Sequence, residues 1–317
     1  MKQRSLGKSG LQVSMVGLGC NNFGGRTDLE ASRTVIHKAL DLGITLFDTA
    51  DVYPVHGGDP GSSEKILGQS LGNRRKDIVL ATKFGMRMDP AGLLRGASRR
   101  YILAAVEASL TRLGTDWIDL YQLHTPDSLT PIEETLRALE DLVREGKIRY
   151  FGCSNLAAWQ VVEAQWTART LGINRIVSCQ YEYSLLARDA ERELLPVMEA
   201  YGIGLLPYFP LASGLLSGKY RKDNLPAGAR LTESRVLSER YLTTANWRIV
   251  EHLEAFCAKR EWSLLELAFA WLAASPAVAS VIAGATRPSQ VEQNVKAVST
   301  MLAPDDLAEI DRLTARN

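Results

Sequence analysis

Four ionisable side chains stand at the ends of three apolar segments in the first half of the chain. Asp48 and Tyr53 lie in "LFDTADVY", Lys83 ends "DIVLATK", and His124 ends "WIDLYQLH". A free tyrosine has a pKa of about 10 and donates protons poorly at neutral pH, but a nearby ammonium favours the phenolate and lowers that pKa. A carboxylate would keep the ammonium charged, and a histidine could hydrogen-bond a carbonyl oxygen. Together the four groups predict the interconversion of a carbonyl and an alcohol, provided that a hydride carrier binds nearby.

Each of these residues also has a structural explanation when it is taken alone. Asp48 could cap the next turn, and Tyr53 could pack within a loop. Lys83 could be a solvated strand end, and His124 a hydrogen-bonded core histidine. Structural roles of this kind outnumber catalytic ones. Three successive apolar segments that each deliver an ionisable group at the same end nevertheless require a common explanation.

Strands alternate with helices along the whole chain. Eight short apolar runs are separated by segments with an apolar residue at every third or fourth position, the spacing of an amphipathic helix. The predicted strands cover 15–19, 44–48, 77–83, 117–124, 148–154, 175–180, 203–208 and 278–284. Clear helical patterns cover 30–43, 101–114 and 130–146. Such alternation predicts parallel strands joined by helical crossovers.

Eight strand–helix units predict a single (β/α)8 barrel, also called a TIM barrel, as one domain over residues 1–317, with a doubly wound open sheet as the alternative. The active site of such a barrel lies at the carboxyl ends of its strands, so the four ionisable groups should converge there. The segments "RSLGK" and "LQVSM" predict a β-hairpin that plugs the other end. The charged stretch 219–245 predicts a long loop at the open end, in the position of a lid.

Composition and charge argue against several classes of protein and partner. The net charge is +1, from 37 basic and 36 acidic residues, which argues against a nucleic acid or an anionic membrane as partner. No run of about 18 apolar residues predicts a membrane helix, and the first residues lack the apolar core of a signal peptide. The four cysteines (Cys20, Cys153, Cys179 and Cys257) form no C-x-x-C pair, which predicts free thiols in a cytoplasmic protein and no metal site.

Two loops late in the chain are suited to the phosphates of a dinucleotide. "GLGCNN" begins like the Rossmann fingerprint but has Asn22 where a third glycine belongs, so that binding mode is not indicated. Barrels bind phosphate in the loops after their seventh and eighth strands. Here these loops are "YFPLASGLLSGKY" and "GATRPSQVEQNV", and the second places Arg287 at a helix start. No acidic residue lies between Gly284 and Gln290, which favours NADPH over NADH because NADPH carries an additional phosphate.

The sequence resembles the aldo-keto reductases along nearly its whole length. The resemblance rests on "FDTADVY", "ATKFG", "DWIDLYQLH", "GKIRYFGCSN", "YFPLASGLLSGKY" and "GATRPSQVEQNV", in that order. It implies a (β/α)8 barrel that reduces aldehydes or ketones with NADPH. It also implies that Tyr53 is the general acid, that Lys83 and Asp48 assist it, and that His124 lies at the substrate oxygen.

The resemblance further implies a set of cofactor contacts. Ser154, Asn155 and Gln180 match positions that hold the nicotinamide carboxamide, and Tyr208 matches the aromatic that stacks on the nicotinamide. The remaining positions lie beside the nicotinamide (Gly19, Cys20), in the pyrophosphate loop (Leu211, Ser213, Lys219), at the adenosine 2′-phosphate (Gly284, Thr286, Arg287, Gln290) and at the adenine (Gln293, Asn294).

The sequence departs from the family pattern at three places. Phe209 stands where serine is common, which removes one side-chain contact to the pyrophosphate or leaves it to the backbone. Gln293 stands where glutamate is common. The segment 54–63 is longer than the usual turn after the tyrosine and brings His56 towards the mouth, where a loop role is expected for it.

Two other functions stay open from the sequence. Some relatives bind nicotinamide yet serve as channel accessories, so a regulatory or sensor subunit with slow turnover is one alternative. A Schiff-base aldolase that uses Lys83 is another, because barrels also support that chemistry. The sequence does not identify the carbonyl substrate, and it leaves open whether the chain is a monomer or a homo-oligomer.

Overall fold

The computed structural model describes residues 1–54 and 57–315. Its centre is an eight-stranded parallel sheet in the order β10-β3-β4-β5-β6-β7-β8-β9. The strands are β3 (Val16–Gly19), β4 (Leu46–Asp48), β5 (Val79–Phe84), β6 (Ile118–Leu123), β7 (Ile148–Ser154), β8 (Ser178–Glu182), β9 (Gly204–Tyr208) and β10 (Val281–Gly284). Every strand lies beside its sequence neighbour, whereas the strand order of a doubly wound sheet reverses partway. This order excludes the open sheet and confirms the predicted (β/α)8 barrel.

The sheet closes on itself between β9 and the residues that lead into β10. Leu205 forms a parallel bridge with Val278. The Leu205 amide donates to the Ala277 carbonyl at 2.8 Å, and the Ala279 amide donates to the Leu205 carbonyl at 2.9 Å. These bonds complete the ring that begins with the pairing of β10 and β3.

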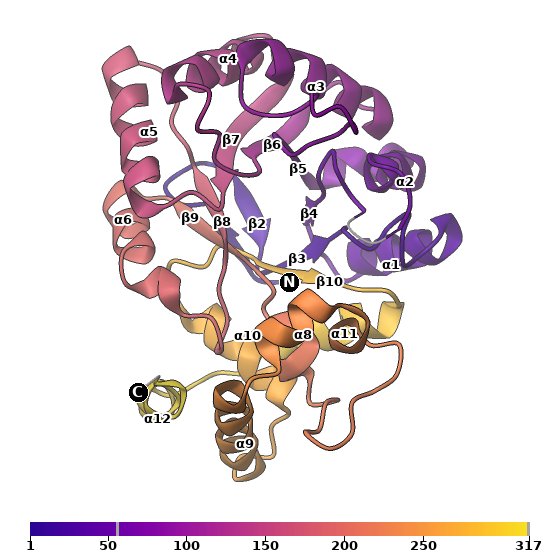
Figure 1. Ribbon diagram of the computed structural model, residues 1–317, viewed down its shortest axis with the longest axis vertical. Coiled ribbons are helices and arrows are strands. Elements are labelled where there is room, and N and C mark those ends of the chain that lie inside the picture. The colour runs from indigo at the N-terminus through magenta and orange to yellow at the C-terminus, as the bar shows by residue number, and fades with distance from the viewer. Residues whose placement is uncertain (55–56, 316–317) are drawn as a thin grey trace.

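Helices surround the barrel, as Figure 1 shows for α1 to α6. The longer helices are α1 (Leu29–Asp41), α2 (Ser62–Leu71), α3 (Arg99–Leu113), α4 (Ile132–Arg144), α5 (Ala158–Leu171), α6 (Leu194–Tyr201), α9 (Thr244–Ala258), α10 (Leu264–Ala274), α11 (Pro288–Ala297) and α12 (Pro304–Thr314). In α3 the buried residues recur every three or four positions, which turns one face to the sheet. The helix ends at Gly114, whose φ of 61° is the left-handed conformation that glycine adopts readily.

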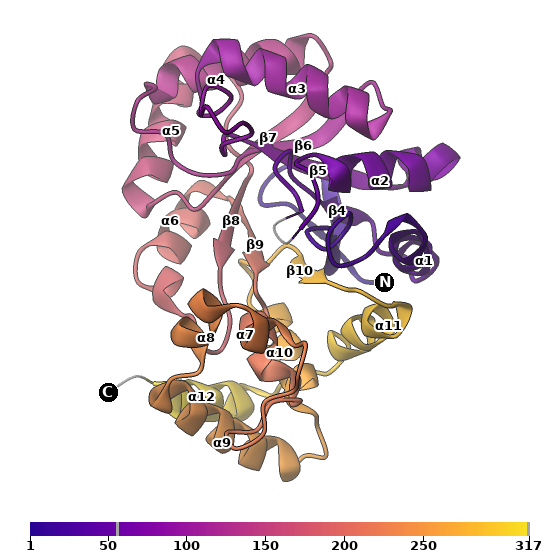
Figure 2. The same ribbon diagram turned by 45° about the vertical axis from the view of Figure 1, so that its right-hand side comes forward.

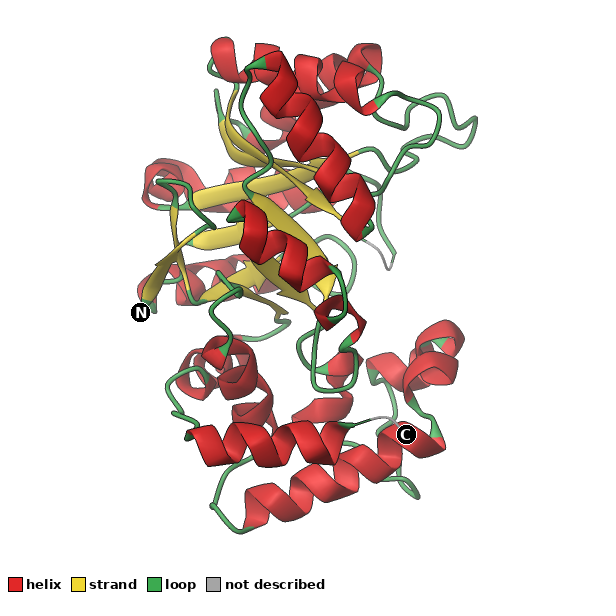
Figure 3. Ribbon diagram, turned by 90° about the vertical axis from the view of Figure 1, so that its left-hand side faces the viewer, coloured by secondary structure: helices red, strands yellow, loops and turns green. Residues whose placement is uncertain are grey.

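The N-terminal hairpin closes one end of the barrel, as the sequence predicted. Strands β1 (Gln3–Ser5) and β2 (Gln12–Ser14) pair in antiparallel fashion, and Figure 3 shows them at one end of the sheet. Leu6 and Val13 are fully buried and join the apolar cluster inside the barrel, which includes Leu46 and Leu206. The polar residues at the carboxyl ends of the strands therefore lie at the opposite, open end.

The segment 219–245 is not the continuous loop that its sequence predicted. It contains the short helices α7 (Arg230–Glu233) and α8 (Arg235–Tyr241) and leads into α9. Figure 2 shows α7 and α8 beside the ends of β8 and β9. Each helix has at most two turns, which is too short for a periodic apolar pattern. The side chains of Leu231 and Tyr241 are nevertheless buried and attach the segment to the barrel.

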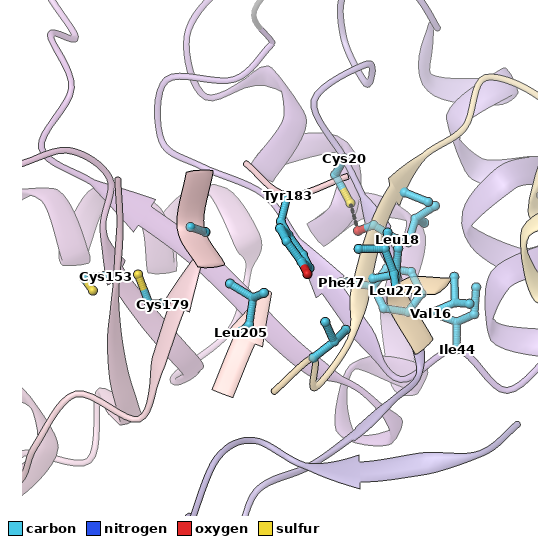
Figure 4. Packing of buried hydrophobic residues seen from close by; sticks show 14 of the residues in the cluster. Val16, Leu18, Cys20, Ile44, Phe47, Cys153, Cys179, Tyr183, Leu205 and Leu272 are labelled. Atoms are coloured by element: carbon cyan, nitrogen blue, oxygen red, sulfur yellow. Dashed lines mark hydrogen bonds between the residues drawn. The ribbon is translucent and has the colours of Figure 1, made fainter. Parts of the chain in front are cut away.

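The main core lies between the sheet and the helices. Figure 4 shows Val16, Leu18 and Phe47 packed together within it, and Cys153 beside Cys179 on the paired strands β7 and β8. All four cysteines are buried free thiols, as expected. No helix within residues 1–54 and 57–315 is long and apolar enough to cross a membrane.

Candidate active site

The carboxyl ends of β4, β5 and β6 bring together the residues that the sequence singled out. Asp48 is the last residue of β4, Lys83 is the second-last residue of β5, and His124 directly follows β6. Tyr53 lies in the connection after β4, where its amide donates to the Ala50 carbonyl at 3.2 Å. The predicted convergence of these four side chains is what the barrel geometry produces.

Asp48 and Lys83 form a buried ion pair below the mouth of the barrel. Lys83 Nζ lies 2.7 Å from Asp48 Oδ2 and 2.8 Å from the Thr49 carbonyl oxygen. The Lys83 side chain is completely buried, and that of Asp48 is 3% exposed. Burial alone lowers the pKa of Lys83, but the negative charge of Asp48 and the Tyr53 phenol outweigh it and raise this pKa. Lys83 is therefore held as an ammonium.

Two glutamines fix the second oxygen of Asp48. Gln180 Nε2 donates to Asp48 Oδ1 at 2.9 Å, and Gln122 Nε2 donates to the same oxygen at 3.2 Å. Gln122 was not among the residues predicted from the sequence. The available signal was its position two residues before His124, because alternate residues of a strand face the same side. The carboxylate is thus oriented from three strands, β5, β6 and β8.

The Tyr53 ring lies between Lys83 and His124. Lys83 Nζ is 5.0 Å from the centroid of the Tyr53 ring, and the ring meets that of His124 edge-on, with centroids 5.7 Å apart. Burial raises the pKa of the Tyr53 phenol above its ordinary value, while the charge of Lys83 and a hydrogen-bonding interaction with it lower this pKa. The sequence-based expectation of a net lowering is wrong, because desolvation exceeds the effect of the cation.

His124 is held as a neutral imidazole. Its side chain is nearly buried, and burial together with the charge of Lys83 lowers the pKa of His124 to about 3. Nδ1 is buried without a hydrogen-bond partner among the residues that the structure describes. The backbone on either side is fixed, since the His124 amide donates to Phe84 and its carbonyl accepts from Asn155. A neutral ring can offer one N–H as a hydrogen-bond donor across the physiological pH range.

The lowered pKa of His124 predicts a stability effect in acid. The unfolded chain takes up this proton near pH 6.5, whereas the folded chain does so only near pH 3, so folding is disfavoured as the pH falls through that interval. Between about pH 6.5 and pH 5, the free energy of unfolding of the wild type should fall by about 2 kcal/mol relative to that of His124→Asn. This follows from about 1.4 kcal/mol per pH unit. Thermal unfolding at both pH values measures this. His252→Asn on the exposed face of α9 is the control, and an unchanging difference between wild type and His124→Asn contradicts the assignment.

Asn155 connects His124 to the aromatic residue that ends β9. Its φ of 61° is unusual for a residue with a side chain. Asn155 Nδ2 donates to the His124 carbonyl at 3.1 Å and to Ser154 Oγ at 3.0 Å, and Asn155 Oδ1 accepts from the Tyr208 hydroxyl at 2.9 Å. Of the residues expected at the nicotinamide carboxamide, Ser154 and Asn155 lie together, and Asn155 contacts Tyr208, the expected stacking residue, while Gln180 is turned onto Asp48.

The loop after β9 has an unusual backbone and contains a buried hydroxyl group. Ala212, Ser213 and Gly214 all have positive φ, at 46°, 57° and 103°, and Leu211 directly precedes them. The amides of Ala212 and Gly214 donate to the carbonyls of Phe209 and Leu211 at 2.8 Å, which holds the loop in a tight turn. Ser213 Oγ is buried without a hydrogen-bond partner within residues 1–54 and 57–315. An oxygen of a bound phosphate would satisfy it, so this loop fits the pyrophosphate of a dinucleotide.

Four cations surround this loop. Burial lowers the pKa of Lys219, and the charges of Arg230, Arg26 and Arg287 lower it further. Arg230 Nη2 donates to Asn22 Oδ1 at 3.1 Å, and Arg26 pairs with Glu233 at 2.7 Å. Mutually repelling cations are typical of a site for an anion. Arg26 and Arg230 were not predicted, because Arg26 lies in the loop after β3 and Arg230 in a segment without a motif.

Phe209 has a structural role in place of the expected serine contact. Its φ is 52°, and its ring packs edge-on against Tyr208 and Tyr241, with centroids 5.2 Å and 6.4 Å away. Tyr241 and Arg240 both hydrogen-bond Glu182 at the end of β8. Phe209 thereby supports the α7–α8 segment where it crosses the open end.

The loop after β10 is the second of the two predicted phosphate loops, and it leads into α11. Gln290 Oε1 accepts from the amide and from the hydroxyl of Thr286, at 2.8 and 3.1 Å. Arg287 is the exposed N-cap residue of α11. The other predicted positions of this region are Gly284 at the end of β10, the exposed Gln293 and the buried Asn294. Gly19 and Cys20 lie buried at the end of β3, and His56 falls outside the described residues.

Comparison with known proteins agrees with this arrangement. The model of the "Aldo/keto reductase family" matches residues 15–315. A rice protein (Oryza sativa subsp. japonica) named "Probable voltage-gated potassium channel subunit beta" is 37% identical over 98% of this chain and 96% of its own length. The L-glyceraldehyde 3-phosphate reductase of Escherichia coli (strain K12) is 35% identical over 98% of this chain and 92% of its own length. The Bacillus subtilis (strain 168) protein "Uncharacterized oxidoreductase YrpG" is 38% identical over 95% of this chain and 92% of its own length. The chain belongs to the aldo/keto reductase family of oxidoreductases.

Proposed function

We propose that this protein reduces aldehydes or ketones to alcohols with NADPH, and that Tyr53 donates the proton. The observation that carries the proposal is the buried Lys83–Asp48 ion pair, whose ammonium lies 5.0 Å from the centre of the Tyr53 ring. Burial on its own makes the phenol a weaker acid, and Lys83 opposes that effect. Proton transfer thus depends on a cation that Asp48 and the two glutamines hold in place.

His124 orients the substrate in this proposal. A neutral imidazole can donate one N–H to the carbonyl oxygen, and Tyr53 can donate its proton to the same oxygen because the two rings touch. Two donors that converge on one oxygen stabilise the negative charge that develops there. NADPH supplies the hydride when it is bound.

The loops after β9 and β10 would hold the dinucleotide. Ser213 with its unpaired hydroxyl, and Lys219 and Arg230 beside it, would take the pyrophosphate. Thr286 and Arg287 at the start of α11 would take the 2′-phosphate, and Gln290 holds the Thr286 backbone. Leu211 would line the pyrophosphate loop, Tyr208 would stack on the nicotinamide, and Gln293 and Asn294 would lie at the adenine.

The fit to NADPH gives a prediction for Arg287. A hydrogen bond to a charged group contributes about 1.5–3 kcal/mol, which corresponds to about a ten- to hundredfold change in Kd. Arg287→Ala should therefore weaken NADPH binding by about that factor and leave NADH binding nearly unchanged. Fluorescence titration with each cofactor measures both constants, with Arg144→Ala on α4 as the control. Equal losses for the two cofactors contradict a role in reading the 2′-phosphate.

The buried environment of Lys83 argues against an aldolase. A Schiff base requires an unprotonated amine, but the pKa of Lys83 is raised and its Nζ is bonded to Asp48 and Thr49. A sensor subunit is favoured only by the names of relatives such as the rice protein. NADPH oxidation in the presence of aromatic, aliphatic, sugar and dicarbonyl substrates tests the proposal. Tight cofactor binding without turnover of any of them would favour the sensor.

A further inference from the structure

A second group of polar side chains is buried on the outer side of β5, away from Lys83. This group, the Asp51 cluster, consists of Asp51, Glu64, Tyr101, Arg112 and Tyr121. Asp51 follows β4, Glu64 lies on α2, Tyr101 and Arg112 lie on α3, and Tyr121 lies on β6. Asp51 is 1% exposed, Glu64 and Tyr121 are completely buried, and Tyr101 is 8% exposed. The proposed reaction uses none of these side chains.

The Asp51 cluster contains two carboxyl groups and one cation. Glu64 takes the best donors, because Arg112 Nε and Thr82 Oγ1 both bond to it at 2.6 Å. Asp51 Oδ2 accepts one longer bond, 3.3 Å, from the Tyr101 hydroxyl. Asp51 Oδ1 is buried with no hydrogen-bond partner among the residues that the structure describes. The single arginine balances Glu64, and no further cation of the cluster balances Asp51.

An ionised Asp51 is therefore unfavourable in this position. A buried carboxylate with an unpaired oxygen beside a second carboxylate favours its protonated form. Burial, and then the charge of Glu64, raise the pKa of Asp51 to about 7, against the opposing effects of Arg112, the Val52 backbone and Tyr101. The charge of Asp51 in turn raises the pKa of both Tyr101 and Tyr121.

Asp51 is tied by its backbone to the proposed catalytic residues. Its amide donates to the Lys83 carbonyl at 3.1 Å, which joins the turn after β4 to β5. Two residues later, the Tyr53 carbonyl accepts from the Gly61 amide at 3.0 Å. Asp51 therefore lies in the same short turn as Tyr53, and backbone hydrogen bonds join this turn to β5 and to the start of α2.

The proposal that follows rests on the proposed function. We propose that Asp51 is a positioning residue for Tyr53: the protonated carboxyl keeps the turn at residues 48–53 packed against α3, and loss of the proton loosens this turn and lowers turnover. Burial of the carboxyl and the charge of Glu64 on α2 oppose its ionisation. Arg112 and the Tyr101 hydroxyl of the cluster favour it, but Glu64 already engages the Arg112 guanidinium and the Tyr101 hydrogen bond is long, at 3.3 Å.

Amide hydrogen exchange tests the proposal without cofactor or substrate. Peptides within residues 46–54 are compared at about pH 6 and pH 8.5, after correction for the intrinsic effect of pH on exchange. In the wild type, corrected exchange should rise at the higher pH. In Asp51→Asn, which stays neutral, it should not. Asp59→Asn, an exposed carboxylate in the same connection, should behave as the wild type does.

Turnover supplies the second measurement. If only the protonated form is active, kcat of the wild type should fall by about tenfold per pH unit above about pH 7. Asp51→Asn should lose this fall in kcat above about pH 7. It should keep the fall at higher pH that comes from ionisation of Tyr53. A wild type that reduces no carbonyl compound refutes the proposed function, whereas the exchange measurement still decides whether Asp51 controls the turn.

A variant that keeps the carboxyl protects the test against misfolding. The Tyr101 hydrogen bond lowers the pKa of Asp51, so Tyr101→Phe should move the rise in exchange to higher pH. Tyr201→Phe on the outer helix α6 is the matched control. An unmoved midpoint in Tyr101→Phe, or the same pH dependence in Asp51→Asn and in the wild type, overturns the proposal.

Discussion

Replacing Tyr53 with phenylalanine is expected to lower kcat for carbonyl reduction by about 10²–10⁴-fold, the usual contribution of general acid–base catalysis. The substitution removes the hydroxyl and leaves the ring, so the edge-on contact with His124 and the position of Lys83 above the ring are retained. NADPH affinity should change little, because the loops after β9 and β10 are untouched.

Steady-state kinetics and a fluorescence titration on the same preparation separate these two effects. Tyr150→Phe, at the other end of the barrel, is a suitable control because it removes a phenol far from the carboxyl ends of the strands. A Tyr53→Phe enzyme that keeps most of its kcat would exclude Tyr53 as the proton donor. A loss of kcat that comes with an equal loss of cofactor affinity would point to disruption of the site as a whole.

Replacing Lys83 with methionine is expected to cost about 3–5 kcal/mol of stability, because it leaves a buried carboxylate without its partner. The residual charge of Asp48 would face only the amides of Gln122 and Gln180. In the direction of alcohol oxidation, where a phenolate is the base, the rise in rate that accompanies ionisation of Tyr53 should move to higher pH, since Lys83 lowers the pKa of Tyr53.

A double variant distinguishes the two roles of this ion pair. Lys83→Met combined with Asp48→Asn removes both charges, so urea unfolding should show much of the stability restored, while the pH–rate profile remains shifted. Lys65 is an exposed lysine on α2. The Lys65→Met variant therefore shows how the loss of an exposed lysine charge alone affects stability and the pH–rate profile. A single Lys83→Met variant whose oxidation rate rises over the same pH range as that of the wild type would contradict the coupling to Tyr53.

The barrel could be predicted from the sequence because its strands are apolar on both faces. Each of the eight predicted strands overlaps an observed one, although the run predicted at 175–180 is shifted to Ser178–Glu182. The pattern of apolar residues in this run does not determine at which residue β8 begins to pair with β7 and β9. The short helices α7 and α8 were missed for a related reason, because their helical conformation depends on docking Leu231 and Tyr241 against the barrel.

The proposed catalytic residues could be found from the sequence because each one lies at the end of a strand or after it. The pKa values of the buried groups could not be predicted in this way. The net direction of the Tyr53 pKa depends on how deeply the fold buries the phenol. The protonation of Asp51 depends on Glu64, which lies on α2, and on Asp51 Oδ1, which has no hydrogen-bond partner in the part of the chain that the structure describes. Arg230 belongs to the site through a contact with Asn22 that no spacing in the sequence indicates, whereas Gln122 could have been found from its position two residues before His124.

The N-terminal hairpin also constrains the order in which the chain can fold. Arg4 donates hydrogen bonds to the carbonyls of Ala273, Ser275 and Val278, and Leu6 packs in a cluster that includes Ile282. These contacts cannot form until nearly the whole chain has left the ribosome. Contacts between residues so distant in sequence carry a large loop-closure cost and slow folding. The hairpin is synthesised long before the residues that it contacts and is thus among the last elements of the barrel to reach its native place, and until then the apolar end of the barrel that it covers remains open.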